Sequence, residues 1–170
     1  MTNTKRDTAQ DTESLFNEAD ECEEMGDLRG AFKRFLIAAQ LGHAMSQVSL
    51  GNFYASGKAV KRDLEEAAHW YKKAYKNGYR DGALNLAIDR RNQGNSRSAM
   101  VWFKKAIAMD SGDACIELAK IYGARKRGQK AAANLLKRAL RMSKDDISED
   151  TKEKAEFLLK AMPKGRRSAP

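Results

Sequence analysis

The sequence predicts an all-α protein: a right-handed α/α solenoid of about four helix-turn-helix repeats, closed by a C-terminal capping helix. Two prolines and 12 glycines in 170 residues leave little turn chemistry for a β-sandwich or barrel, while the helix formers Ala, Leu, Lys, Glu and Arg dominate the composition. Apolar residues make up 42% and charged residues 32%, as in soluble proteins with a core. A pattern that recurs every 32 to 36 residues then selects a repeat architecture.

The pattern is a small, a large and a small residue at spacings of four and three. On a helix these residues form one stripe, and its small members let a neighbouring helix approach closely. Each triplet therefore predicts the second helix of a repeat. The triplets are Ala31, Phe35 and Ala38; Ala67, Tyr71 and Ala74; Ala99, Phe103 and Ala106; and Ala132, Leu136 and Ala139.

A partner helix is predicted before each triplet. It carries a large and a small residue, in two units an aromatic, and then a glycine that predicts the C-terminal stop. A single hairpin cannot bury its stripe alone, so the four must stack to form a continuous core. These sets are Leu15, Ala19 and Cys22 before Gly26; Leu50, Gly51 and Tyr54 before Gly57; Leu86 and Ala87 before Gly94; and Leu118, Ala119 and Tyr122 before Gly128.

Helix ends and domain limits follow from local signals. Asp63, with Glu66 three residues on, predicts a capping box, and Ser96 is a second candidate N-cap. The stretch from about Ser148 to Met162 predicts the capping helix. We therefore expect a repeat array over 11–142, a capping segment over 143–162, and disorder at 1–10 and in the basic tail 163–170.

Residues 44–83 resemble the Sel1-like repeat, a branch of the tetratricopeptide-type solenoids. The other units are degenerate: Arg90 stands where an aromatic is expected, and Leu135 and Leu136 replace Trp and Tyr. The resemblance covers roughly residues 11–142 and implies an adaptor or scaffold that binds other proteins. The matching positions are Ala44, Leu50, Gly51, Tyr54, Gly57, Val60, Asp63, Ala67, Trp70, Tyr71, Ala74, Gly78 and Ala83.

Charge is unevenly distributed along the chain. Residues 1–30 hold three bases and nine acids, a net charge of −6, whereas residues 31–144 hold 23 bases and 8 acids, a net charge of +15. A basic body suits an acidic protein, nucleic acid or an anionic membrane surface. The alternative is that these Lys and Arg side chains only solvate the outer faces of helices, and the sequence leaves both interpretations open.

Residue patterns for catalysis are absent from the sequence. His43 and His69 have no third ligand at metal spacing, and the stretch 123–130 lacks the spacing of a phosphate-binding loop. We expect a non-enzyme without metal or cofactor. Cys22 and Cys115 are far apart and belong to no CxxC pair, and no secretory signal or run of 18 apolar residues occurs. These features predict a cytoplasmic protein with reduced thiols.

Two surfaces are candidates for binding. The first is the concave wall, which the first helices of such a solenoid line. The second is a basic turn near a helix N-terminus, where four cations in six residues could hold a phosphate or carboxylate. Matching to the tetratricopeptide pattern places Asp20, Glu23, Glu24, Asn52, Ala55, Ser56, Arg91, Asn92 and Lys120 on the concave wall. The basic turn comprises Arg125, Lys126, Arg127 and Lys130.

These observations predict a small cytoplasmic binder of one cognate protein, with an acidic partner surface favoured by the net charge of +9. Such a binder suits an immunity or antitoxin-like inhibitor of a toxin or effector, and equally an adaptor or scaffold in a larger bacterial complex. Nucleic-acid binding is the weaker alternative, because aromatic side chains for stacking are not interleaved with the basic turn. Homodimer formation stays open.

Overall fold

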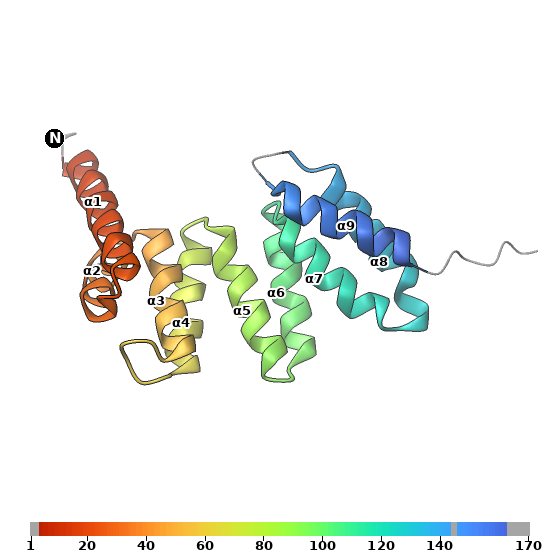
Figure 1. Ribbon diagram of the computed structural model, residues 1–170, viewed down its shortest axis with the longest axis horizontal. Helices are drawn as coiled ribbons and strands as arrows, with labels where there is room; N and C mark the ends of the chain where they lie inside the picture. The colour runs from red at the N-terminus through yellow and green to blue at the C-terminus, as the bar shows by residue number, and fades with distance from the viewer. Residues whose placement is uncertain (1–3, 144–145, 163–170) are drawn as a thin grey trace, which may run out of the picture. The chain divides into compact units, whose positions relative to one another are not determined.

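The computed structural model describes residues 4–143 and 146–162, and in these ranges the chain is all-α, as predicted (Figure 1). The side chains of residues 4–9 and of Lys126 are not described. Clustering of contacts divides the chain into an N-terminal unit, residues 1–102, and a C-terminal unit, residues 103–170. The elements are α1 (Thr4–Glu24), α2 (Leu28–Gln40), α3 (Ala44–Ser56), α4 (Leu64–Lys76), α5 (Arg80–Asn92), α6 (Ser96–Ala108), α7 (Gly112–Gly123), the 3-10 turn η1 (Lys126–Gly128), α8 (Gln129–Leu140) and α9 (Glu149–Ala161).

In the N-terminal unit, α1 packs on α2, α2 on α3, α3 on α4 and α4 on α5. The small–large–small stripes are buried as predicted: Phe35 is fully buried and Tyr71 is 2% exposed. Gly51 on α3 faces the ring of Tyr71, so a side chain there would overlap the ring. The stripe therefore packs two helices together at the short distance that small residues permit.

In the C-terminal unit, α7 packs on α8, and α9 lies against both. The triplet Ala132, Leu136 and Ala139 is buried. Thr151 of α9 donates its hydroxyl to Asp113 Oδ1 of α7 at 2.8 Å, which ties the last helix to the repeat. The predicted helix near Ser148 is confirmed, and Ser148 accepts a hydrogen bond from the backbone N–H of Thr151 at 3.2 Å.

Several predicted helix ends are confirmed. Asp63 Oδ1 accepts the backbone N–H groups of Glu65 and Glu66, both at 3.0 Å, so Asp63 is the N-cap of α4. Gly57 has φ +77° and ends α3 in the left-handed region that disfavours other residues. Gly26 and Gly94 likewise follow α1 and α5 with positive φ.

Two predicted helix ends are wrong. Asn95 caps α6, not Ser96, because Asn95 Oδ1 accepts the Ser98 N–H at 3.0 Å and Ser96 is already the first helical residue. Gly128 does not stop α7, which ends five residues earlier at Gly123; Gly128 instead lies in η1 with φ −91°. A side chain at Gly128 would overlap the Tyr122 carbonyl, so the glycine permits a close approach of backbone segments.

The first helix starts earlier than the sequence predicted. Helix α1 begins at Thr4, inside the stretch 1–10 for which disorder was expected. Between Thr4 and Gly26 the sequence has neither Gly nor Pro, so nothing in the covalent chain interrupts the helix there. Residues 1–3 and the basic tail 163–170 lie outside the described residues.

Candidate protein-binding groove

The first helices of the N-terminal unit enclose two hollows that meet on α3. One, of about 210 Å³, is lined by Glu23 of α1, by Lys58 and by residues of α3. The other, of about 330 Å³, lies among α3, α4 and α5. Asn52 and Ser56 line both hollows. We call the pair the first-helix groove, and its lining residues are Glu23, Ser49, Asn52, Phe53, Ala55, Ser56, Lys58, Tyr71, Asn85, Ile88 and Asp89.

Asn52 is held in place at the centre of this groove. Its Oδ1 accepts the hydroxyl of Tyr71 at 2.7 Å and the amide Nδ2 of Asn85 at 3.2 Å. Burial, and then the nearby Asp89 charge, raise the pKa of the Tyr71 phenol, so that hydroxyl remains a donor at neutral pH. Three helices therefore fix the amide, and the groove presents a preorganised polar wall.

The rim of the groove is also ordered by hydrogen bonds. Ser56 Oγ donates to the Asn52 carbonyl at 2.7 Å and accepts the backbone N–H of Lys58 at 3.3 Å. Lys58 Nζ lies 3.5 Å from Glu23 Oε1, so an exposed ion pair crosses the smaller hollow from the loop after α3 to α1. Exposed pairs of this kind open at little cost, and a partner can therefore replace either member.

Asp89 is the polar residue of the groove that the sequence interpretation missed. Its Oδ2 is buried and has no hydrogen-bond partner among the residues that the structure describes. Burial raises the pKa of the Asp89 carboxyl, although the positive charges of Arg62 and Arg90 act in the opposite direction. The register of the repeats carried a signal for it, because a residue 36 positions earlier on α3, Phe53, is an aromatic core residue.

The predicted concave residues divide into three groups. Glu23, Asn52 and Ser56 line the groove, together with Ala55. Four others lie on the same first helices but line neither hollow: Asp20, Glu24 and Asn92 are exposed, and Arg91 is half-buried. Lys120 belongs to the C-terminal unit. Its Nζ pairs with Glu117 Oε1 at 2.6 Å, and it lines a largely apolar hollow of about 390 Å³ formed by α7, α8 and α9.

The basic turn connects α7 with α8. Arg125, Arg127 and Lys130 are exposed, and none of the three has an ion-pair partner within the described part of the chain. Gly128 precedes α8 and offers no side chain to cap it. These cations are available to an anion, but exposed charges alone bind weakly. Use of this turn stays a prediction, and the side chain of Lys126 lies outside the described residues.

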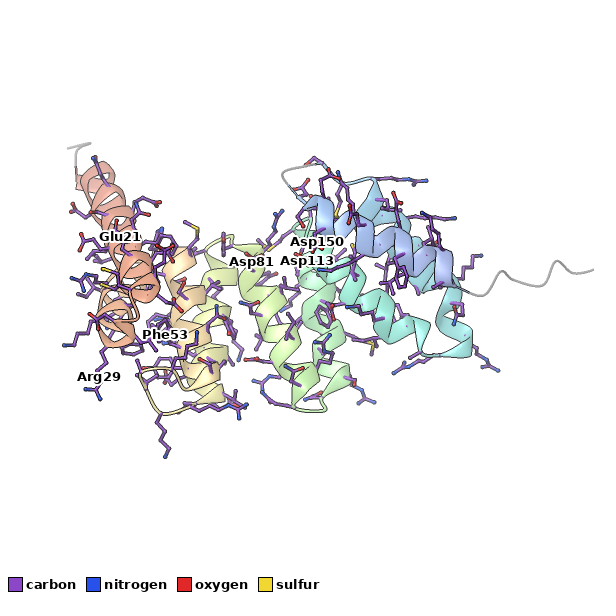
Figure 2. The ribbon with its side chains drawn as sticks, in the orientation of Figure 1. Glu21, Arg29, Phe53, Asp81, Asp113 and Asp150 are labelled. Atoms are coloured by element: carbon purple, nitrogen blue, oxygen red, sulfur yellow. The ribbon has the colours of Figure 1, made fainter. Side chains whose placement is uncertain are left out.

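The first and second helices of the hairpins differ in charge, in addition to the difference between the N-terminal 30 residues and the rest of the chain. The first helices α1, α3, α5 and α7 contain six bases and twelve acids, whereas the second helices α2, α4, α6 and α8 contain twelve bases and two acids. Glu21 of α1 and Arg29 of α2, both labelled in Figure 2, are exposed examples. The first-helix groove is thus acidic to neutral, and the second helices are basic.

His43 caps a helix, and both cysteines are buried. His43 caps α3: its Nδ1 accepts the Ser46 N–H at 3.4 Å, and its Nε2 lies 3.2 Å from Glu13 Oε2. Cys22 and Cys115 are buried and form no disulfide. Throughout the described ranges there is no group of three His, Cys, Asp or Glu side chains arranged for a metal ion, and no helix there is long and apolar enough to cross a membrane.

Comparisons with known proteins agree with this fold. A Sel1 repeat protein from Oxalobacter formigenes is 20% identical with a TM-score of 0.58, and the match covers 76% of this chain and 53% of that one. A protective antigen of uropathogenic Escherichia coli strains, described as displaying an SLR fold, is 24% identical with a TM-score of 0.71, over 89% of this chain and 33% of that one. This chain thus spans about half of the length of the first protein and about a third of the length of the second.

No curated protein matches the sequence. The family model for the Sel1 repeat matches residues 44–79 and 88–111. The first range contains α3, α4 and the turn that follows them, and the second runs from the last turns of α5 to the end of the α6–α7 connection. The α3–α4 hairpin and the segment around α6 are therefore similar to Sel1 repeats.

Proposed function

We propose that this chain is a non-enzymatic module that binds one cognate protein, and that a segment of the partner lies in the first-helix groove. Sel1 repeats are generally protein–protein interaction modules. The observation that carries the proposal is the pair of hollows joined at Asn52 and Ser56, where hydrogen bonds fix the polar side chains before a partner arrives. Such preorganisation lowers the ordering cost of binding.

We infer that the partner is acidic overall. The net charge of +9 and the twelve bases of the second helices attract such a protein within about 10 Å, the screening length at about 0.1 M salt. This attraction acts on the encounter and requires no contact with the groove. An acidic partner can therefore approach the basic second helices and still place a neutral or basic segment in the groove.

The biological role that we propose is inhibition of a toxin or effector, in the manner of an immunity protein or antitoxin. A dedicated inhibitor forms a stoichiometric complex with one protein, and the first-helix groove on the N-terminal unit offers a site for one segment of such a partner. The alternative role is that of an adaptor in a larger complex. A pull-down with an adaptor would recover two or more proteins together.

A tagged pull-down from the native cell tests the proposal, with and without nuclease and at about 50 mM and about 300 mM salt. The matched variants are Ser56→Arg, which fills the groove, and Gln40→Arg, which adds the same charge at another exposed helix C-terminus. We expect the wild type and Gln40→Arg to capture one stoichiometric acidic protein, with or without nuclease. Ser56→Arg should fail to capture that protein.

Three other outcomes would overturn parts of the proposal. Recovery of nucleic acid, with every protein lost after nuclease, would replace the protein-binding function. Equal capture by both variants would move the interface away from the groove. An association rate that stays constant between the two salt concentrations would remove the acidic-partner inference, because long-range attraction is screened by salt.

A further inference from the structure

The repeat register identifies Asp89 as an exception within its own fold. Leu50 and Gly51 of α3 correspond to Leu86 and Ala87 of α5, an offset of 36 residues. With the same offset, Asp89 stands where Phe53 stands in the preceding repeat. Phe53 is 2% exposed and packs with Phe35 and other core residues of α1 and α2 (Figure 2). Helix α5 thus has a carboxylate where α3 has a buried aromatic ring.

The substitution leaves space as well as charge. The larger hollow of the groove, about 330 Å³, is lined by Asp89 and by polar side chains of α3, α4 and α5. A phenylalanine is much larger than an aspartate, so the volume that the ring fills in one repeat stays open in the next. We call this hollow the Asp89 pocket; its lining residues are Asn52, Ala55, Ser56, Tyr71, Asn85, Ile88 and Asp89.

Neighbouring cations do not satisfy the Asp89 carboxylate. Arg62 and Arg90 lie near enough to act on its charge, but Arg62 Nε donates to the Ala55 carbonyl at 2.9 Å. Arg90 donates one guanidinium N–H to Gln93 Oε1 at 2.9 Å. Asp89 Oδ2 is buried without a donor in the part of the chain that the structure describes. A buried carboxylate oxygen that lacks a donor costs stability, which a core position would not normally carry.

We propose that the Asp89 pocket receives a lysine or arginine side chain of the partner, whose ammonium or guanidinium group pairs with the Asp89 carboxylate. The inference rests on the proposed protein-binding function and specifies what the groove recognises. Asn52 Oδ1 is already engaged by two donors, so the Asp89 carboxylate is the charged acceptor that the pocket lining offers. The aromatic ring of Tyr71 and the side chain of Ile88 provide apolar walls for the alkyl part of such a side chain.

A cation fits this site better than a neutral or anionic group. An anionic group would lie beside the Asp89 carboxylate, and like charges repel. A neutral amide could donate one hydrogen bond but would bring no positive charge to the carboxylate. A charged donor satisfies both requirements, and charge-assisted hydrogen bonds are about twice as strong as neutral ones.

The pocket is tested directly with ethylguanidinium, which imitates the end of an arginine side chain, and with N-ethylurea, a neutral molecule of the same shape. The readout is the shift of the side-chain amide NMR signals of Asn52 and Asn85 at constant ionic strength. The variants are Asp89→Asn, which keeps the shape and removes the charge, and Asp11→Asn, which removes an exposed charge from α1.

We expect saturable shifts with ethylguanidinium in the wild type and in Asp11→Asn, and affinity at least about fivefold weaker in Asp89→Asn and for N-ethylurea. Equal binding of the two probes, or unchanged binding in Asp89→Asn, would overturn the proposal. Asp89→Phe restores the aromatic of the preceding repeat. It should abolish the shifts and raise the Tm by about 3 °C or more, whereas a lower Tm would contradict the register argument.

The same variants separate this inference from the proposed function. If wild type and Asp89→Asn capture the same protein with equal affinity, the groove function stands and the pocket assignment fails. If ethylguanidinium binds as expected but no protein is captured by the wild type, the pocket stands and the proposed function fails. A loss of capture of about tenfold in Asp89→Asn, with Asp11→Asn unchanged, supports both.

Discussion

Replacing Gly51 by alanine should destabilise the N-terminal unit, although alanine is the better helix former. Gly51 lies inside α3 and is buried against Tyr71. A Cβ atom at Gly51 would lie 2.5 Å from Cε1 and 2.6 Å from Cδ1 of the Tyr71 ring. Carbon atoms in contact prefer a separation of about 3.5–4.0 Å, so the ring must move by about 1 Å or the two helices must separate.

The expected loss follows from three contributions. Overpacking of a dense core costs about 1–3 kcal/mol. A displaced Tyr71 ring also weakens its hydroxyl hydrogen bond to Asn52, which is 2.7 Å long, and such a bond contributes about 1 kcal/mol. Against these losses, Gly to Ala inside a helix gains about 1 kcal/mol. The net prediction is a loss of about 1–3 kcal/mol, and Gly51→Leu should lose more than Gly51→Ala.

Urea unfolding followed by tryptophan fluorescence measures the effect, since Trp70 neighbours Tyr71 on α4. Gly123→Ala is the matched control. Gly123 is the last residue of α7, and a Cβ there would lie 3.9 Å from Ala132 Cβ, an ordinary contact. We expect this control to be neutral or stabilising by up to about 1 kcal/mol.

A double-mutant cycle tests the physical cause. In the Tyr71→Leu background the ring is gone, so Gly51→Ala should cost less than half of what it costs in the wild type. If Gly51→Ala leaves the free energy of unfolding unchanged, the close approach of α3 to Tyr71 is wrong. If the cost is equal in both backgrounds, the loss does not come from the ring.

Substitutions at four further positions test a second close helix contact, a helix cap and two buried titratable groups. Gly82→Ala should destabilise more than Gly51→Ala by urea unfolding, because its Cβ would meet backbone atoms of α4, among them Tyr75 N at 2.7 Å. Asp63→Ala should cost about 1 kcal/mol through loss of the α4 cap, and Asp63→Asn should restore most of this in the same measurement. Burial raises the pKa of the Cys115 thiol to about 11 from 9.0, so the unfolded chain ionises first as the pH rises. Urea midpoints should therefore fall as the pH rises from about 9 towards 11, and less so in Cys115→Ala. Burial also raises the pKa of Asp89, so its cost to the fold appears as the pH rises above the ordinary value of 3.8. Asp89→Asn should accordingly be more stable than wild type at about pH 7, with the difference shrinking towards about pH 3; a constant difference would show that the charge is not its cause.

The buried stripes were predictable from sequence because they follow one simple physical rule. A helix pair that approaches closely needs small residues around one large residue, and the rule repeats in every unit. Phe35, Tyr71 and Leu136 therefore differ in chemistry and still occupy the same place in the packing. Helix ends depend instead on single hydrogen bonds, so the sequence led to Ser96, whereas the side chain that accepts the capping hydrogen bond belongs to its neighbour Asn95.

The candidate site was predictable only in part, for a similar reason. Glu23, Asn52 and Ser56 were found because residues that do not serve packing on a first helix must face outward. The rule did not identify Asp89, because the equivalent residue of the preceding repeat, Phe53, packs in the core. Internal comparison with Phe53 would have revealed the substitution, but not that Asp89 Oδ2 lacks a donor, which depends on where Arg62 and Arg90 direct their hydrogen bonds.

The repeat architecture explains how such a costly residue can be accommodated. The stripes of the second helices hold each hairpin together, and the α5 position of Asp89 contributes instead to packing between neighbouring first helices. A chain whose units each contribute their own stripe and interface terms can weaken one interface without losing the others. Asp89 weakens the interface between α3 and α5 and opens a hollow in the first-helix groove. Stability given up at a ligand site in this way is a common feature of functional positions, and it is why Asp89→Phe should stabilise the fold and abolish the pocket together.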